Sequence, residues 1–329
     1  MQTRTVRAAA TLLALLLLPA AGAAQGKDGK EAAPEGDPVL WRDPGDVGAR
    51  DLLEGPAEAP RPDLSRVAYV RDETGGYSPK FRVRDGAGRV WVAKMGREAQ
   101  PETAAARLVW AVGYAAETSY LVPCVRIEGA PARRVERCGG DGFANVRFEA
   151  RPAEWRRLGT WGWARNPFEG TREFKGLVVM MGLLNNWDLK DDNNKIIYVP
   201  GAGGARGELR YVVADLGATF GKTGDFTSRS RNEPQSYVKT RFVERVEGDR
   251  VRFGYAGKNA ALFGDVRVEH ARWVGGLLAR LTDAQISDAF RAANYSDADV
   301  RALAAAVRAK TNELVHLPGG AGVAGTRQP

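Results

Sequence analysis

The stretch from Asn185 to Gly217 decides the fold and reads NNWDLKDDNNKIIYVPGAGGARGELRYVVADLG. A polar loop precedes two apolar, β-branched segments, which a glycine-rich turn joins, and this pattern predicts a β-hairpin. Asp188 and Asn193 lie before the hairpin and Asp215 lies at its end. One carboxylate can orient a nucleophile, while an amide oxygen and a second carboxylate are ligands for hard cations that bridge phosphates. The stretch therefore predicts a Mg-nucleotide site.

The sequence around this stretch predicts a mainly helical lobe over residues 151–317. Residues 173–184 place apolar side chains on one helical face and lead directly into the polar loop. Residues 219–239 are polar and predict a long irregular segment. Residues 269–314 predict two or three amphipathic helices, two of which begin after a Thr or Ser N-cap.

Residues 63–150 show a different pattern, which predicts a small antiparallel sheet with one helix. Alternating apolar residues separated by TGGYSP and DGAG predict three strands at 66–71, 80–84 and 89–95. Pro101 and Glu102 suit the first turn of a helix that follows. Two further strands are expected at 120–127 and 133–138. The predicted fold class is therefore α+β, with a sheet-plus-helix lobe followed by a helical lobe.

The first 62 residues and the last 12 predict segments outside these lobes. Residues 1–24 combine Arg4 and Arg7 with an apolar run and small residues, which is typical of a secretory signal. Residues 25–62 are rich in Gly, Pro and Ala and predict a flexible linker with one possible helical turn near 47–53, and the Gly-rich residues 318–329 predict a disordered tail. We therefore expect an exported, periplasmic or extracellular protein with no transmembrane segment after signal removal.

The two cysteines and two histidines limit the kinds of site that the chain can carry. Cys124 and Cys138 are compatible with one disulfide in an oxidising compartment or with two buried thiols. His270 and His316 are far apart, which disfavours a histidine-based zinc site or a serine–histidine relay. The net charge is +8, and the basic residues are scattered along the chain. The sequence contains no stripe of alternating aromatic and basic residues, so no nucleic-acid partner is expected.

Three motifs, in their order along the chain, resemble motifs of the protein-kinase-like superfamily. DLKDDN (188–193) resembles the catalytic-loop pattern D-L-K-x-x-N, DLG (215–217) resembles the metal-binding D-F-G, and VWVAK (90–94) resembles the third-strand V-A-I-K. The DLGATFG run is also similar to exported atypical kinases of the secretory pathway and to phosphoinositide-type lipid kinases. The resemblance covers residues 66–314 and implies a two-lobed fold with nucleotide between the lobes.

The resemblance also implies roles for individual residues. Lys94 would contact the α and β phosphates, and Glu102, or Glu98 as the alternative, would pair with it. Asp188 would orient the attacking hydroxyl, and Lys190 would neutralise the transferred phosphoryl group. Asn193 and Asp215 would bind Mg²⁺ or Mn²⁺, and the amides of Gly75 and Gly76 would cover the phosphates of ATP.

The sequence departs from the protein-kinase pattern at several places. Gly75-Gly76 is not a full G-x-G-x-x-G, Trp187 replaces the usual Arg before the catalytic Asp, and no A-P-E follows DLG. From the resemblance as a whole we predict an exported phosphotransferase that moves the γ-phosphoryl of Mg-ATP to a hydroxyl on a protein, lipid or small molecule. The alternative is an exported pseudokinase or binding module that keeps the fold without transfer.

Overall fold

The computed structural model describes residues 34–318 except 57 and 226, and the chain from Pro34 onward forms one compact unit. The predicted signal segment and the predicted tail, apart from Pro318, lie outside the described residues. Within residues 34–318, apart from 57 and 226, every helix is too short or too polar to cross a bilayer.

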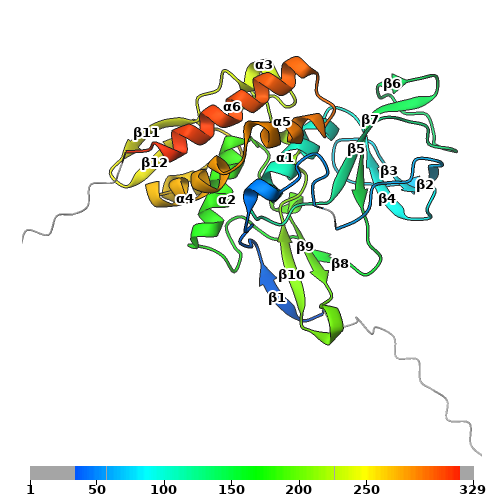
Figure 1. Ribbon diagram of the computed structural model, residues 1–329, viewed down its shortest axis with the longest axis horizontal. Helices are drawn as coiled ribbons and strands as arrows, with labels where there is room; N and C mark the ends of the chain where they lie inside the picture. Colours follow the sequence, from blue (N-terminus) through cyan, green and yellow to red (C-terminus); the bar gives the residue numbers. More distant parts are fainter. Residues whose placement is uncertain (1–33, 57, 226, 319–329) are drawn as a thin grey trace, which may run out of the picture. The chain divides into compact units, whose positions relative to one another are not determined.

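The first lobe is an antiparallel sheet with strand order β2-β3-β4-β7-β5, in which the short strand β6 also pairs with β7 (Figure 1). Alternate residues on one face, among them Phe81, Ala93 and Phe148, pack into an apolar core. The opposite face carries the polar residues of the candidate site. The strands are β2 (Ala68–Asp72), β3 (Lys80–Arg84), β4 (Val90–Lys94), β5 (Ser119–Val125), β6 (Arg137–Cys138) and β7 (Gly142–Ala150).

The strand predicted at 133–138 is wrong in its position. Only Arg137–Cys138 pairs there, and the strand that completes the sheet is β7. Arg147 and Glu149 alternate with Val146, Phe148 and Ala150 in β7, and both are buried in ion pairs on the face opposite the apolar core. Cys124 and Cys138 form a disulfide, one of the two alternatives that the sequence left open.

Helix α1 (Ala99–Ala111) begins near the predicted position and connects the two lobes. It follows β4, but its side chains Ala104, Leu108 and Val109 belong to the core of the helical lobe. Figure 1 shows α1 between the sheet and α5 (Asp283–Arg291). The helix is therefore held by the lobe that it faces as well as by the strand that precedes it.

The prediction of a flexible linker over residues 25–62 is wrong for the part that the structure describes up to residue 55. Strand β1 (Gly36–Val39) pairs in parallel with β10 (Gly207–Val212), and a 3₁₀ turn follows at Val47–Ala49. Leu40, Val47 and Leu52 are buried in the helical core. The overall composition of this segment, rich in Gly and Pro, suggested disorder. Burial of its few apolar side chains nevertheless holds it against the helical lobe.

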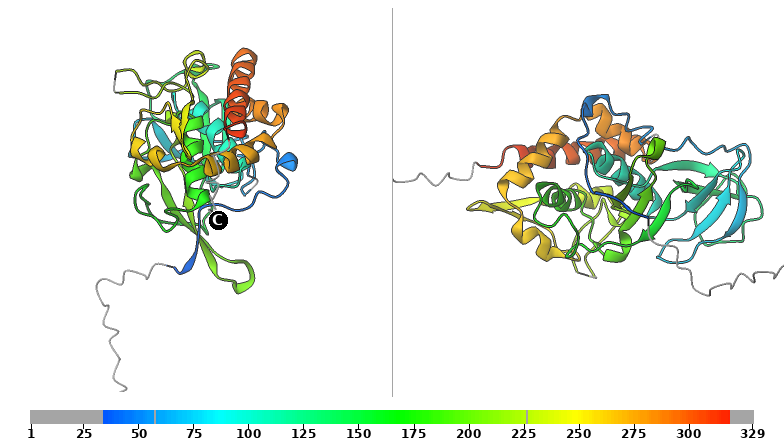
Figure 2. Two further views of the ribbon diagram at one scale, coloured as in Figure 1. Left: turned by 90° about the vertical axis from the view of Figure 1, so that its left-hand side faces the viewer. Right: turned by 90° about the horizontal axis from the view of Figure 1, so that it is seen from below.

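The second lobe is mainly helical, and its strands form a small second sheet with order β1-β10-β9-β8 and a separate hairpin β11–β12. The small sheet projects away from the helices (Figure 1 and Figure 2). Thr171, Thr282 and Ser296 each accept a hydrogen bond from a first-turn amide and so begin the three helices α2, α5 and α6. The α+β class is confirmed. The remaining elements are β8 (Arg156–Gly159), α2 (Arg172–Leu183), β9 (Lys195–Val199), α3 (Pro234–Tyr237), β11 (Val243–Glu247), β12 (Arg250–Phe253), α4 (Val268–Ala279) and α6 (Asp297–Val315).

Candidate active site

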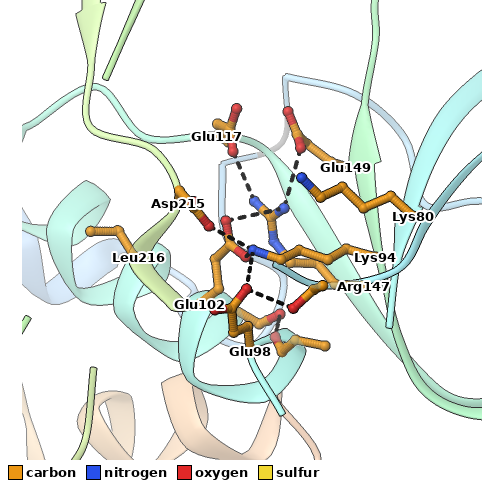
Figure 3. A network of polar contacts seen from close by, with 12 residues as sticks. Lys80, Lys94, Glu98, Glu102, Glu117, Arg147, Glu149, Asp215 and Leu216 are labelled. Atoms are coloured by element: carbon orange, nitrogen blue, oxygen red, sulfur yellow. Dashed lines mark hydrogen bonds and ion pairs between the residues drawn. The ribbon is translucent and has the colours of Figure 1, made fainter. Parts of the chain in front are cut away.

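Lys94, the last residue of β4, lies at the centre of a buried group of carboxylates. Its Nζ lies 2.8 Å from Glu102 and 3.0 Å from Glu98, both on or beside the first turn of α1. It also lies 2.6 Å from Asp215 (Figure 3). The predicted pairing with Glu102 is therefore present, and the alternative partner Glu98 is engaged at the same time.

The electrostatics of this group follow from burial against opposite charge. Burial alone would lower the pKa of Lys94, but Glu102, Asp215 and Glu98 outweigh it, so the pKa is raised and the side chain is a cation. The pKa of Glu102 is raised by burial, although Arg147 and Lys94 oppose the shift. Burial would also raise the pKa of Asp215, but Lys94 lies so close that the pKa falls below its ordinary value. Asp215 is thus an anion, the form in which a carboxylate binds a cation.

Arg147 supports Glu102 from the sheet and was not anticipated from the sequence. It lies directly opposite Lys94 in the β4–β7 ladder and is 1% exposed. Its guanidinium reaches Glu102 at 3.4 Å, Glu117 at 3.2 Å and Glu149 at 3.3 Å. Figure 3 shows this guanidinium between Glu117 and Glu149, behind Lys94. A basic residue in the apolar run FANVRF was the only sequence signal for it.

Asp215 is held at the end of the predicted hairpin in an unusual backbone conformation. It has φ 53° and ψ 47°, a left-handed conformation that non-glycine residues adopt rarely and Asp more often than most. Lys195 pairs with Val212 in the β9–β10 ladder. Asn193, two residues before that pair, and Asp215, three residues after it, therefore lie at the same end of the hairpin.

Asp188 lies in the loop between α2 and β9 with its carboxylate between two lysines. Its Oδ2 lies 2.8 Å from the Nζ of Lys190, and its Oδ1 lies 3.5 Å from the Nζ of Lys258. Oδ1 is buried and accepts no hydrogen bond from the described residues. Asn193 donates its side-chain amide to the Asp188 carbonyl at 2.7 Å, which leaves its amide oxygen available. A buried acceptor without a donor is expensive unless a substrate proton meets it.

Residues 255–259, which we call the strap, fix the backbone of this loop. The Tyr255 hydroxyl donates to the Asn186 carbonyl at 2.7 Å, and the Lys258 amide donates to the Trp187 carbonyl at 2.9 Å. The side chain of Asn259 donates to the Leu189 carbonyl at 2.8 Å. Three carbonyls around Asp188 are therefore satisfied by one distant segment, which no motif in the sequence announced.

The predicted glycine turn is present between β2 and β3 at the same end of the sheet as Lys94. Gly75 and Gly76 both have positive φ, 95° and 73°, which an L side chain would adopt under strain. The Lys80 ammonium, opposite Lys94 in the sheet, donates to the Gly75 carbonyl at 2.7 Å. Ser78 donates to Glu98 at 2.6 Å, which ties the turn to the start of α1.

A cavity of about 550 Å³ adjoins this group of residues. Arg82, Val92 and Glu149 are paired across the sheet, two residues from the row that holds Lys94, so both rows share one face. Arg82 and Glu149 line the cavity, as do Ile197 and Val212 of the hairpin. Lys94, Asp188 and Asp215 are not in its lining. The lining residues Glu117 and Glu149 contact Arg147, which contacts Glu102, the partner of Lys94. The volume falls within the range of small-molecule sites.

The donor set at the hairpin end fits a hard divalent cation. Asp215 supplies an ionised carboxylate whose side chain is 38% exposed, and Asn193 supplies an amide oxygen. Mg²⁺ prefers one or two such oxygens, with water and phosphate completing the coordination. Within the described residues no cluster of three or more His, Cys, Asp or Glu side chains forms a closed metal cage, and an open, substrate-completed site does not require one.

The structure brings most of the predicted residues together in two groups. Lys94, Glu102 and Asp215 are in contact, and Lys190 and Asn193 contact Asp188. Four groups follow one another along the chain: the buried lysine of the sheet, its helical partner, the loop aspartate and the carboxylate after the hairpin. These are Lys94, Glu102, Asp188 and Asp215. This order is the one that the sequence resemblance implies.

Comparisons with known proteins found similarity to solved structures at low sequence identity. No family model and no curated protein matches the chain. The chain is similar to the crystal structure of a Helicobacter pylori proinflammatory kinase, CtkA, with 10% identity, a TM-score of 0.47, and coverage of 78% of this chain and 97% of that one. It is also similar to the Rio2 kinase–ADP/Mg²⁺–phosphoaspartate complex from Chaetomium thermophilum, with 13% identity, a TM-score of 0.32, and coverage of 76% and 72%.

Proposed function

We propose that the protein is a phosphotransferase that moves the γ-phosphoryl group of ATP to a hydroxyl acceptor. The observation that carries the proposal is the ion pairing of Lys94 with Glu102 and Asp215, because it presents a fixed cation beside an ionised cation ligand. Phosphoryl transfer depends on such positioned charge more than on covalent chemistry. Glu102 is itself held by Arg147, so the cation is placed before any ligand arrives.

In this proposal Lys94 contacts the α and β phosphates, and Gly75 and Gly76 cover them with backbone amides. Asp188 accepts the proton of the acceptor hydroxyl at Oδ1, the oxygen that lacks a hydrogen bond. A bond forms between the acceptor oxygen and the γ-phosphorus while the bond from that phosphorus to ADP breaks. Lys190 neutralises the transferred group from a side chain that is 45% exposed.

Asn193 and Asp215 would hold Mg²⁺ or Mn²⁺, which supplies neutralisation of the phosphate charge when bound. The base of the nucleotide would occupy the cavity lined by Arg82, Ile197 and Val212. We also propose an exported location, which residues 1–24 and the Cys124–Cys138 disulfide support.

The experiment that tests the proposal is phosphoryl transfer from labelled ATP with Mg²⁺ or Mn²⁺ by the protein from Gly26 onward. ATP turnover or phosphate incorporation that disappears in both Asp188→Ala and Asp215→Ala is expected. A folded wild-type protein that binds nucleotide and shows no turnover with either metal would overturn the proposal. That result would favour the alternative of a pseudokinase or binding module.

A further inference from the structure

Lys258 is a second ammonium group at Asp188 and lies outside the motifs that the sequence resembles. Its Nζ lies 3.5 Å from Asp188 Oδ1, whereas Lys190 contacts Oδ2, so the two lysines contact opposite oxygens of one carboxylate. Each lysine side chain is 45% exposed, while the Asp188 side chain is 13% exposed. Solvent and substrate therefore meet the two cations before they meet the anion.

The strap delivers this lysine to a fixed position. The backbone amide of Lys258 donates a hydrogen bond to the Trp187 carbonyl. The next residue, Asn259, has φ 55° and donates its side-chain amide to the Leu189 carbonyl. At Gly257 a Cβ would lie 2.7 Å from the Trp187 Cα, so close an approach needs glycine. A chance surface lysine does not require a segment built in this way around a loop.

The neighbouring Asp191 does not offset the charge of the two lysines. Asp191 is turned away, because its carboxylate accepts the Trp163 amide at 2.9 Å. Asp188 carries one negative charge against the two positive charges of Lys190 and Lys258. A net positive charge therefore faces the space that the acceptor hydroxyl must enter to reach Asp188 Oδ1.

We infer that the acceptor is an anionic hydroxyl compound, with a phosphate group near the hydroxyl that is phosphorylated, and that Lys258 binds that phosphate. This inference rests on the proposed role of Asp188. The Nζ of Lys258 lies only 3.5 Å from Asp188 Oδ1. A phosphate bound to Lys258 therefore puts a neighbouring hydroxyl of the same compound beside Oδ1. The phosphate can belong to a soluble compound or to a lipid head group, because both present the same dianionic or monoanionic oxygens.

The test uses glycerol 3-phosphate, with glycerol as the uncharged probe, titrated by calorimetry into the protein from Gly26 onward in the presence of saturating Mg-ADP. Binding of glycerol 3-phosphate but not glycerol is expected, with an affinity at least 10-fold weaker in Lys258→Gln and within about threefold of wild type in Lys258→Arg. Lys239→Gln, which changes an exposed lysine outside the strap and the loop, is the matched control and should leave the affinity unchanged.

Asp188→Asn separates an anion site from a purely structural lysine. Removal of the carboxylate charge should tighten glycerol 3-phosphate binding several-fold, whereas a structural role for Lys258 predicts no change. Thermal unfolding of each variant confirms that it is folded. Vesicles of phosphatidylglycerol against phosphatidylcholine form the lipid arm, and binding that Lys258→Gln abolishes there but not with the soluble probe would assign the phosphate to a lipid.

The outcomes also distinguish this inference from the proposed function. If Mg-ADP does not bind but Lys258-dependent binding of glycerol 3-phosphate persists, the nucleotide proposal fails while the anion site stands. If wild type and Lys258→Gln bind both phosphate probes equally, or neither protein binds either probe, the inference is overturned.

Discussion

The two halves of the candidate site are fixed by different means. Around Lys94 the positions are set by side-chain charges, since Glu98, Glu102 and Asp215 all contact one ammonium group. Around Asp188 they are set by hydrogen bonds that the strap donates to backbone carbonyls of the loop, and Asp188 Oδ1 itself accepts no hydrogen bond from the described residues. The half around Lys94, which we propose faces the phosphates and call the phosphate-facing half, has its charges paired. The half around Asp188, which we propose faces the acceptor and call the acceptor-facing half, has a fixed backbone but a carboxylate oxygen without a hydrogen bond. Substitutions in the two halves should consequently have different signatures.

The largest effect is expected from Asp188→Asn in the acceptor-facing half. Loss of the general base should lower turnover by about 10²–10⁴-fold, because the amide cannot accept the hydroxyl proton at Oδ1. The free energy of unfolding should change little, since the lysines that contact Asp188 are half-exposed. Steady-state ATP turnover and urea unfolding measure the two quantities. A large stability loss with only a modest rate change would contradict the assignment.

Arg147→Met should show the opposite signature in the phosphate-facing half. Removing a buried guanidinium takes one cationic partner each from Glu102, Glu117 and Glu149. We expect a loss of about 3–5 kcal/mol in the free energy of unfolding, measured by urea titration. Arg66→Gln, which breaks the exposed ion pair with Glu128, is the control. It should change the free energy of unfolding by less than about 0.5 kcal/mol. Equal effects of the two substitutions would show that the buried network is not structural.

Lys310 makes the support of the acceptor-facing half sensitive to pH. It is buried under the Tyr237 ring and donates to Thr240, which also accepts from Asn185 at the start of the loop. Burial lowers the pKa of Lys310 to about 7, although Glu313 opposes the shift. Between pH 7 and the unfolded pKa of 10.5 the unfolded chain binds a proton that the folded chain has released. Stability should therefore rise with pH across this window, by up to about 1.4 kcal/mol per pH unit.

Urea unfolding at intervals from pH 7 to pH 10 measures this slope, and Lys310→Met is the comparison. The variant should lose that part of the slope and be more stable than wild type at neutral pH, since no charge has to be desolvated. Identical pH profiles for the two proteins would show that Lys310 does not titrate in this range.

Tyr255→Phe should give the smallest of these effects and tests the strap directly. The substitution removes the donor to the Asn186 carbonyl and keeps the ring that stacks on Phe263 at 4.2 Å. A loss of about 1 kcal/mol in stability is expected, with a several-fold fall in turnover as the loop loosens. Thermal unfolding and ATP turnover are the measurements. Unchanged turnover at reduced stability would mean that the strap does not position Asp188.

How far the sequence predicts this site depends on whether a residue lies in a local pattern. Lys94, Asp188 and Asp215 stand at strand ends and in a polar loop, where short-range alternation and turn residues locate them. Arg147 and Lys258 act through contacts across the sheet and from the strap, so local periodicity carries no information about them. The same limit explains the mistaken linker, because tertiary pairing with β10 overrides the composition of residues 36–39.

The anchoring of the segment before the sheet has a mechanical consequence. Residues 36–55 contact the helical lobe, the chain then enters the sheet lobe, and it returns through residues 151–155. The chain also enters the helical core between these two points, because α1 follows β4 and packs there before β5 returns to the sheet. The sheet lobe is thus joined to the helical lobe at both ends of its sequence and again through α1. Connections at several points resist rotation of one lobe against the other, so Lys94 and Asp188 should keep one relative alignment while nucleotide enters and leaves.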